Sequence, residues 1–258
     1  MGGFLYRVNE LTLYVLALVL MVGAVEAGAW LGRWHHARGT GEGEGFLSSL
    51  AGPSIGLLAL MIGFTFSMSL SRFDARKDAA LQEANAIGTA ALRGRMLPAP
   101  YDRNVAPLFQ EYLKLRIVER GFRLDTPQGI ARLERSAALQ EDLWKQAMAA
   151  AKADPQMVPT GLFVQALNEM IDMGETRITA GRNSVPAAVF VMLAGIAITA
   201  LGFSGFETAR SSRYHRIAMV ITAVMIATII LLVFDLDNPQ AGLISVSQQP
   251  LLDLLQTM

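Results

Sequence analysis

Residues 50–71 read LAGPSIGLLALMIGFTFSMSLS and contain no charged side chain. A helix needs about 20 predominantly apolar residues to cross a bilayer, so this stretch is long enough to span one. The charged residues that follow, 72–78 (RFDARKD), are joined to it without an intervening glycine or proline. We therefore expect one unbroken helix that continues past the membrane to Leu97, where Pro98 and Pro100 stop it.

Three further stretches are apolar enough to span a membrane, namely residues 11–31, 184–206 and 217–234. The first contains one charge, Glu26. It also contains Ala27-Gly28-Ala29, which has the form of a signal-peptide cleavage site. We favour a retained membrane helix, because the acidic Glu10 follows the basic residue Arg7 by three positions and the apolar run is long for a signal core.

The composition supports a membrane protein and argues against several other classes. The chain has 258 residues, of which 52% are apolar and 17% charged, and its mean hydropathy is +0.37. Residues 72–182 hold 16 of the 22 Lys/Arg and 14 of the 22 Asp/Glu. A net charge of zero disfavours nucleic-acid binding, and the absence of cysteine excludes a disulfide framework. No catalytic or metal-binding motif is present, so we expect neither an enzyme nor a cofactor.

These patterns predict an all-α fold with four parts. Residues 1–71 carry two spans and a Gly/Glu loop at 39–45, 72–183 form a cytosolic helical domain, 184–235 carry two spans, and 236–258 form a tail. Within the helical domain we expect helices over 104–120, from Asp125-Thr126-Pro127 to residue 153, and over 160–180. Strand signals are nearly absent.

The second span carries polar side chains on one face: Thr65, Ser69 and Arg72, with Arg76 one turn beyond. Lipid offers such groups no hydrogen-bond partner, so they must meet protein or water. One hypothesis is that the face lines a water-filled path through an oligomer. The alternative is ordinary helix packing, with the hydroxyls bonded to carbonyls one turn earlier.

Acidic residues at the membrane ends are the other candidates. Glu26 is an intramembrane carboxylate, and it has either a functional role or an ion pair with Arg33 or with a basic residue among 210–216. Asp235 and Asp237 follow the fourth span and form either a cation site or a helix end and turn. Glu83 is equally consistent with a solvated face or with burial against a neighbour.

Two sets of residues resemble bacterial membrane proteins with a bestrophin-like domain. The first comprises 72–74 (RFD), 83–88 (EANAIG) and 97–98 (LP), and the second is 236–247 (LDNPQAGLISVS). The order of two spans, a helical segment and two more spans is also similar. The resemblance covers nearly the whole chain.

The resemblance implies a relation to bestrophins, which are oligomeric anion channels whose second helix lines a central pore. It implies that the protein lies in a bacterial inner membrane, with both termini and residues 72–183 on the cytoplasmic side. The bulky apolar residues that match a bestrophin pore are Leu57, Met61, Phe64 and Met68. Bestrophins have a calcium site with a dense run of acidic residues, whereas this chain offers only Asp235 and Asp237.

The first interpretation is therefore a homo-oligomeric channel, a tetramer or pentamer, that conducts inorganic ions passively across the lipid bilayer. The second is a non-conducting scaffold or sensor whose helical domain binds a partner. A third is a membrane enzyme that acts on lipid through Glu26 or residues 210–216.

Overall fold

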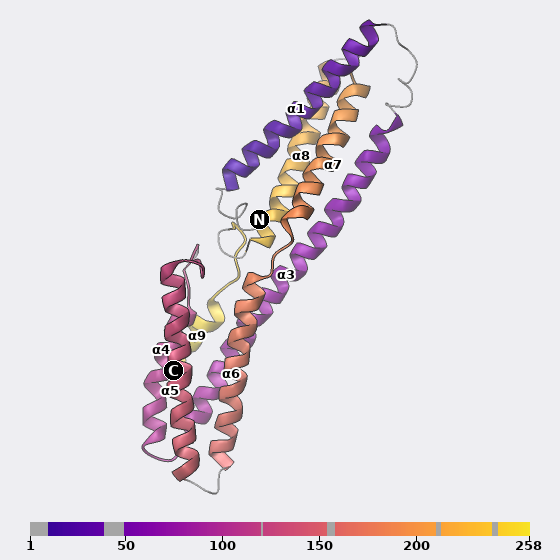
Figure 1. Cartoon of the computed structure of the whole chain (residues 1–258). Coiled ribbons are helices and arrows are strands. Elements are labelled where there is room, and N and C mark those ends of the chain that lie inside the picture. The colour runs from indigo at the N-terminus through magenta and orange to yellow at the C-terminus, as the bar shows by residue number, and fades with distance from the viewer. Residues whose placement is uncertain (1–9, 39–48, 120, 154–157, 210–212, 239–241) are drawn as a thin grey trace. The chain divides into compact units, whose positions relative to one another are not determined.

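The chain is helical throughout the part that the structure describes. The computed structural model describes residues 10–38, 49–119, 121–153, 158–209, 213–238 and 242–258, and within these ranges it contains no strand. The helices are α1 (Glu10–Ala37), α3 (Ala51–Gly94), α4 (Tyr101–Arg116), α5 (Pro127–Ala153), α6 (Val158–Arg182), α7 (Ala187–Glu207), α8 (Arg213–Asp237) and α9 (Gln249–Thr257) (Figure 1). The predicted all-α fold is confirmed, and α1, α3, α7 and α8 contain stretches long and apolar enough to cross a membrane. The predicted Gly/Glu loop at 39–45 lies outside the described residues.

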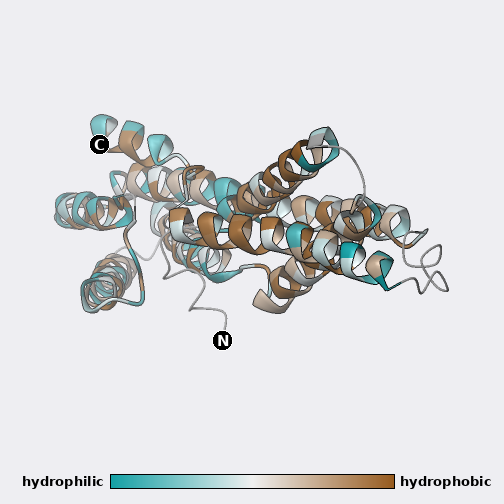
Figure 2. Cartoon of the chain, turned by 90° about the horizontal axis from the view of Figure 1, so that it is seen from above, coloured by the Kyte–Doolittle hydropathy of each residue, from teal (hydrophilic) through white to brown (hydrophobic). Residues whose placement is uncertain are grey.

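The helices divide into two compact units. Met1–Ser71 and Ser184–Asn238 make up one, called here the membrane unit, and Arg72–Asn183 and Pro239–Met258 make up the other, called the polar unit. Helix α3 contributes residues to both. Long brown stretches of apolar helix contrast with teal segments of polar residues in Figure 2.

In the membrane unit, α1 packs against α7 and α8. Small residues make the α1–α7 contact close: a Cβ atom added to Gly28 would lie 2.0 Å from the carbonyl oxygen of Gly202, and one added to Gly205 would lie 2.2 Å from that of Val25. Helix association in lipid depends on such close packing, because apolar burial supplies little drive there. The buried core residues are Met21, Val25, Leu58, Leu193, Ala197, Ala200, Leu201, Ala223, Ile226 and Ala227.

The polar unit has its own hydrophobic core, built from the second part of α3 and from α4, α5, α6 and α9. Its fully buried side chains include Ile87, Phe109, Tyr112, Leu113, Leu139, Leu143, Phe163, Leu167 and Met170. Helix α9 was not predicted, yet it is amphipathic and buries Leu251. Gly88 of α3 leaves room for it, since a Cβ atom there would lie 3.2 Å from the Leu254 side chain.

Two boundaries show how local chemistry sets the helices. The predicted start of α5 is confirmed: Thr126 accepts a hydrogen bond from the Gly129 N–H at 3.1 Å and precedes Pro127. The predicted end of α4 at residue 120 is wrong, because the helix ends at Arg116. There the Arg132 side chain donates to the carbonyls of residues 114, 115 and 117, which satisfies acceptors that the last turn leaves without helical partners.

Candidate functional site

Helix α3 presents two different faces where it belongs to the membrane unit. Leu57, Phe64 and Met68 lie within one helical stripe and are exposed, Phe64 with 62% of its surface accessible. Met61 is half-buried beside them and packs against the core of the unit. The apolar half of the predicted lining is therefore available on the surface of a single chain.

The polar half of the predicted lining faces inward. Thr65 and Ser69 are 1% and 0% exposed, and Arg76 is also buried. The Thr65 hydroxyl donates to the Met61 carbonyl at 2.7 Å, which is the bond expected of ordinary packing. Arg72 is half-buried. Helical spacing brings these four residues onto one face, but in this chain that face is largely covered.

Glu26 has a basic partner. Its carboxylate accepts a hydrogen bond from Arg216 at 3.1 Å, and both side chains are about half exposed, at 46% and 50%. Arg216 is among the partners that the sequence offered, although residues 210–212 of the same basic segment lie outside the described part of the chain. The contact joins α1 to the start of α8, and a half-exposed pair of this kind contributes little to stability.

Asp235 and Asp237 lie at the end of α8 and are both buried. The Asp237 carboxylate accepts the Val185 N–H through both oxygens, at 3.0 and 2.8 Å. Because Val185 precedes α7, this bond fixes the start of the third span to the end of the fourth. Within the described residues no three His, Cys, Asp or Glu side chains gather as metal ligands. The cation role of the two aspartates stays a prediction.

The most concentrated polar chemistry lies in the polar unit, around Glu83. This carboxylate is 0% exposed and binds two guanidinium groups, Arg116 at 2.5 Å and Arg177 at 2.6 Å. Arg177 also donates to the side chain of Gln248 at 2.9 Å, and Arg116 donates to the Gly174 carbonyl at 3.3 Å. The network thus joins α3, α4, α6 and the residue that precedes α9.

Tyr112 lies beside this network. Its ring lies 5.8 Å from the Arg116 guanidinium carbon, and its hydroxyl accepts a hydrogen bond from Gln140 at 3.1 Å. Burial raises the pKa of the Tyr112 hydroxyl above its ordinary value, and the Glu83 charge adds to the rise while Arg116 opposes it. The hydroxyl therefore stays protonated at neutral pH.

A sequence signal for the burial of Glu83 existed, although its partners were not predictable. Glu83 lies between Ala80 and Ile87 at helical spacing, in a stripe whose other members are apolar and buried. Periodicity therefore indicates a buried face. The two arginines are 33 and 94 residues away along the chain, and no local pattern connects them to it.

The comparisons with known proteins agree with this architecture. The model of the bestrophin-like domain matches residues 12–251. The chain belongs to the bestrophin-like family. A crystal structure of a bacterial bestrophin homologue from Klebsiella pneumoniae is similar to it, with a TM-score of 0.63 and 17% identity over 96% of this chain and 99% of that one. A single-substitution variant of that homologue gives a TM-score of 0.67 and 17% identity over 94% of this chain and 98% of that one. No curated protein sequence matches this bestrophin-like chain.

Proposed function

We propose that this bestrophin-like protein assembles into a homo-oligomer, a tetramer or pentamer, and conducts inorganic ions passively through a central pore lined by α3. Membership of the bestrophin-like family supports the channel function. The exposed stripe on α3 is the reason for choosing this helix as the pore lining. Leu57, Phe64 and Met68 are bulky apolar residues that a single chain leaves uncovered. Rings of such residues, one from each copy, form the kind of apolar constriction that controls conduction in channels.

The buried polar residues of α3 take a different place in this proposal. Thr65, Ser69 and Arg76 are covered within one chain, so they lie behind the lining and support it. Arg72 is half-buried at the end of the apolar stretch and adds positive charge near one mouth. A nearby positive charge raises the local concentration of anions, and Glu26 and Asp235/Asp237 are the acidic groups that would attract cations.

Ion flux into liposomes that contain the purified protein tests the proposal. Phe64→Ala widens an apolar ring, so we expect faster flux than in the parent protein. Phe66→Ala is the matched control, because Phe66 is also exposed but lies about 160° away from Phe64 around the helix. Absence of flux from the parent protein, or equal effects of the two substitutions, would contradict the pore assignment. A dimer without flux would instead support the scaffold interpretation.

We also propose that the protein lies in a bacterial inner membrane, with both termini and residues 72–183 on its cytoplasmic side. The chain has no cysteine, so an introduced one reports on a single position. Asp253 is exposed on α9, and Asp253→Cys should resist a membrane-impermeant thiol reagent in intact spheroplasts and react after lysis. Reaction before lysis would show that the C-terminal helix lies on the other side of the membrane.

A further inference from the structure

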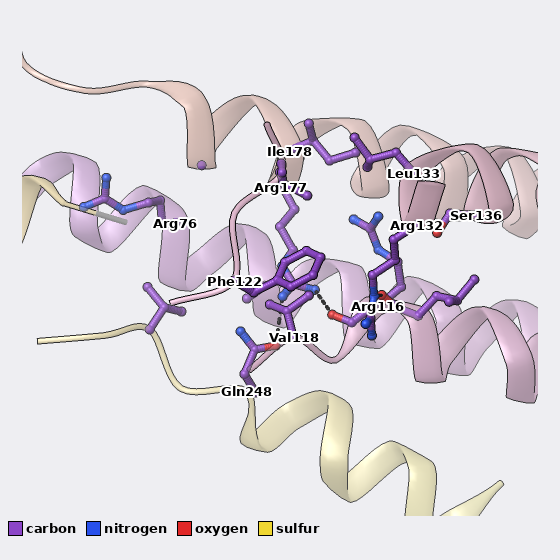
Figure 3. Close-up of a pocket in the computed structure, with 15 residues that line it drawn as sticks. Arg76, Arg116, Val118, Phe122, Arg132, Leu133, Ser136, Arg177, Ile178 and Gln248 are labelled. Carbon is purple, nitrogen blue, oxygen red and sulfur yellow. Dashed lines mark hydrogen bonds between the residues drawn. The ribbon is translucent and has the colours of Figure 1, made fainter. Parts of the chain in front are cut away.

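A cavity of about 140 Å³ lies within the polar unit, next to the Glu83 network. Its lining comes from α3, α4, α5 and α6, from the segment between α4 and α5, and from residues just before α9. Figure 3 shows the labelled side chains of Arg116, Arg132 and Arg177 around it, with Phe122 and Gln248. All of these residues belong to the polar unit.

The wall of the cavity carries more positive charge than the one carboxylate bonded to it neutralises. Its lining includes Arg76, Arg116, Arg132 and Arg177, and none of the described residues in the lining is a carboxylate. Glu83 neutralises one charge of the pair Arg116 and Arg177. Arg132 donates only to backbone carbonyls within the described chain. Without counting Arg76, the three guanidinium groups therefore carry three positive charges, and the carboxylate of Glu83 supplies one negative charge.

The arginines also have donors to spare. A guanidinium group carries five N–H donors. Arg116 uses Nε and Nη2, and Arg132 likewise uses Nε and Nη2, so neither Nη1 group donates to the described residues. Their existing bonds hold both side chains in place. Fixed guanidinium groups of this kind bind carboxylates with little loss of conformational freedom.

The rest of the wall is mostly apolar. Phe122 lies under the Arg132 guanidinium at 5.3 Å, and the remaining apolar lining includes Leu124, Leu133, Ile178 and Val246. Ser136 and Gln248 add two neutral polar groups. Apolar walls with a few fixed polar groups are typical of sites for small organic ligands. Such a wall disfavours a fully hydrated inorganic ion.

We propose that this cavity binds a small organic anion, a carboxylate attached to a compact apolar body. The carboxylate meets the guanidinium groups of Arg116 and Arg132, and the apolar body contacts Phe122 and Ile178. The lining residues of the cavity belong to the polar unit, whereas Leu57, Phe64 and Met68 belong to the membrane unit. Occupation of the cavity joins four helices of the polar unit and stabilises their arrangement through binding to the folded state alone.

Phenylacetate is a suitable probe, because it is water-soluble and combines a carboxylate with one ring. Calorimetric titration of the full chain in lipid nanodiscs should show saturable binding, with empty nanodiscs as the blank. Phenylacetamide keeps the shape and loses the charge, and we expect its binding to be at least about tenfold weaker, as for a lost charge-assisted hydrogen bond. Equal binding of the amide, absence of phenylacetate binding, or a preference for inorganic phosphate would overturn the proposal.

Two variants place the binding in this cavity. Arg132→Gln removes one guanidinium, and we expect binding at least about tenfold weaker than in the parent chain. Val118→Trp keeps every arginine and fills the space, so it should abolish binding even if Arg132→Gln disturbs the end of α4. Arg135→Gln is the matched control, since Arg135 is on the same helix, half-exposed and bound to Glu111. If a folded Val118→Trp protein binds phenylacetate as the parent does, or if Arg135→Gln weakens binding equally, the assignment is wrong.

Discussion

Replacing Glu83 by glutamine removes the charge that holds the centre of the polar unit together. Glutamine keeps one acceptor oxygen, but its amide group would point N–H donors at whichever guanidinium the oxygen does not serve. One of the two bonds to Arg116 and Arg177, at 2.5 and 2.6 Å, is therefore lost. Since the side chain at position 83 is 0% exposed, water cannot reach the glutamine amide there.

The expected loss in the free energy of unfolding is about 3–5 kcal/mol, the range for a buried ion pair deprived of one partner. Glu111→Gln is the matched control, because its bond to Arg135 is also short, at 2.7 Å, but both side chains are about half exposed. An exposed pair contributes about 0.2–1 kcal/mol. The contrast between the two substitutions tests burial rather than the mere presence of an ion pair.

Hydrogen exchange followed by mass spectrometry is the appropriate assay, because a chain with two units need not unfold in one transition. Peptides from the second part of α3, from α4 and from α6 should lose protection by about 100-fold to 4,000-fold in Glu83→Gln, given tenfold per 1.4 kcal/mol. Peptides from α7 should change little. Equal loss of protection in Glu83→Gln and Glu111→Gln would refute the reasoning.

A triple variant separates charge from packing. Glu83→Leu, Arg116→Met and Arg177→Met together remove all three charges and keep much of the buried volume. Replacement of a whole buried ion network by apolar residues is often neutral or stabilising. We therefore expect this protein to be more protected than Glu83→Gln, and lower protection would show that packing dominates the site.

Three further predictions concern other contacts. Gly28→Ala should destabilise the α1–α7 contact by about 1–3 kcal/mol in thermal unfolding, because its Cβ would lie 2.0 Å from a backbone oxygen. Gly23→Ala should not destabilise it, because the space around Gly23 is open. Asp237→Ala should weaken the start of α7 by about 1.5–3 kcal/mol, measured as exchange at the Val185 amide. Asp253→Ala, at an exposed position of α9, should leave that amide unchanged. Because burial raises the pKa of Tyr112, the folded state holds its proton more tightly than the unfolded state. This contribution to the stability of the folded state is fully present below the ordinary tyrosine pKa of about 10, and it is lost as the pH rises through the pKa of Tyr112 in the folded state. Tyr112→Phe lacks this titrating group, so its alkaline denaturation should begin at higher pH.

The fold was largely predictable because its strongest signals are local. Four apolar runs are long enough to span a bilayer, and Thr126-Pro127 marks a helix start that the structure confirms. The end of α4 was not predictable, since it depends on Arg132 in the next helix. Helix α9 has only nine residues, too few for periodicity alone to separate it from a tail.

The candidate sites were predictable only in part, for a related reason. Helical spacing correctly groups Thr65 and Ser69 on one face, but it does not say whether neighbouring helices or water cover that face. The same limit applies to the arginine cavity. Its guanidinium groups come from α3, α4, α5 and α6, and only the folded chain brings them together.

The order of synthesis gives the buried carboxylate a further consequence. Glu83 leaves the ribosome 94 residues before Arg177, a delay of about 5–20 s at elongation rates of about 5–20 residues per second. Until α6 emerges, the carboxylate lacks one of its two counter-charges, and water is its best environment. Glu83 therefore acquires both of its partners only after translation has passed α6.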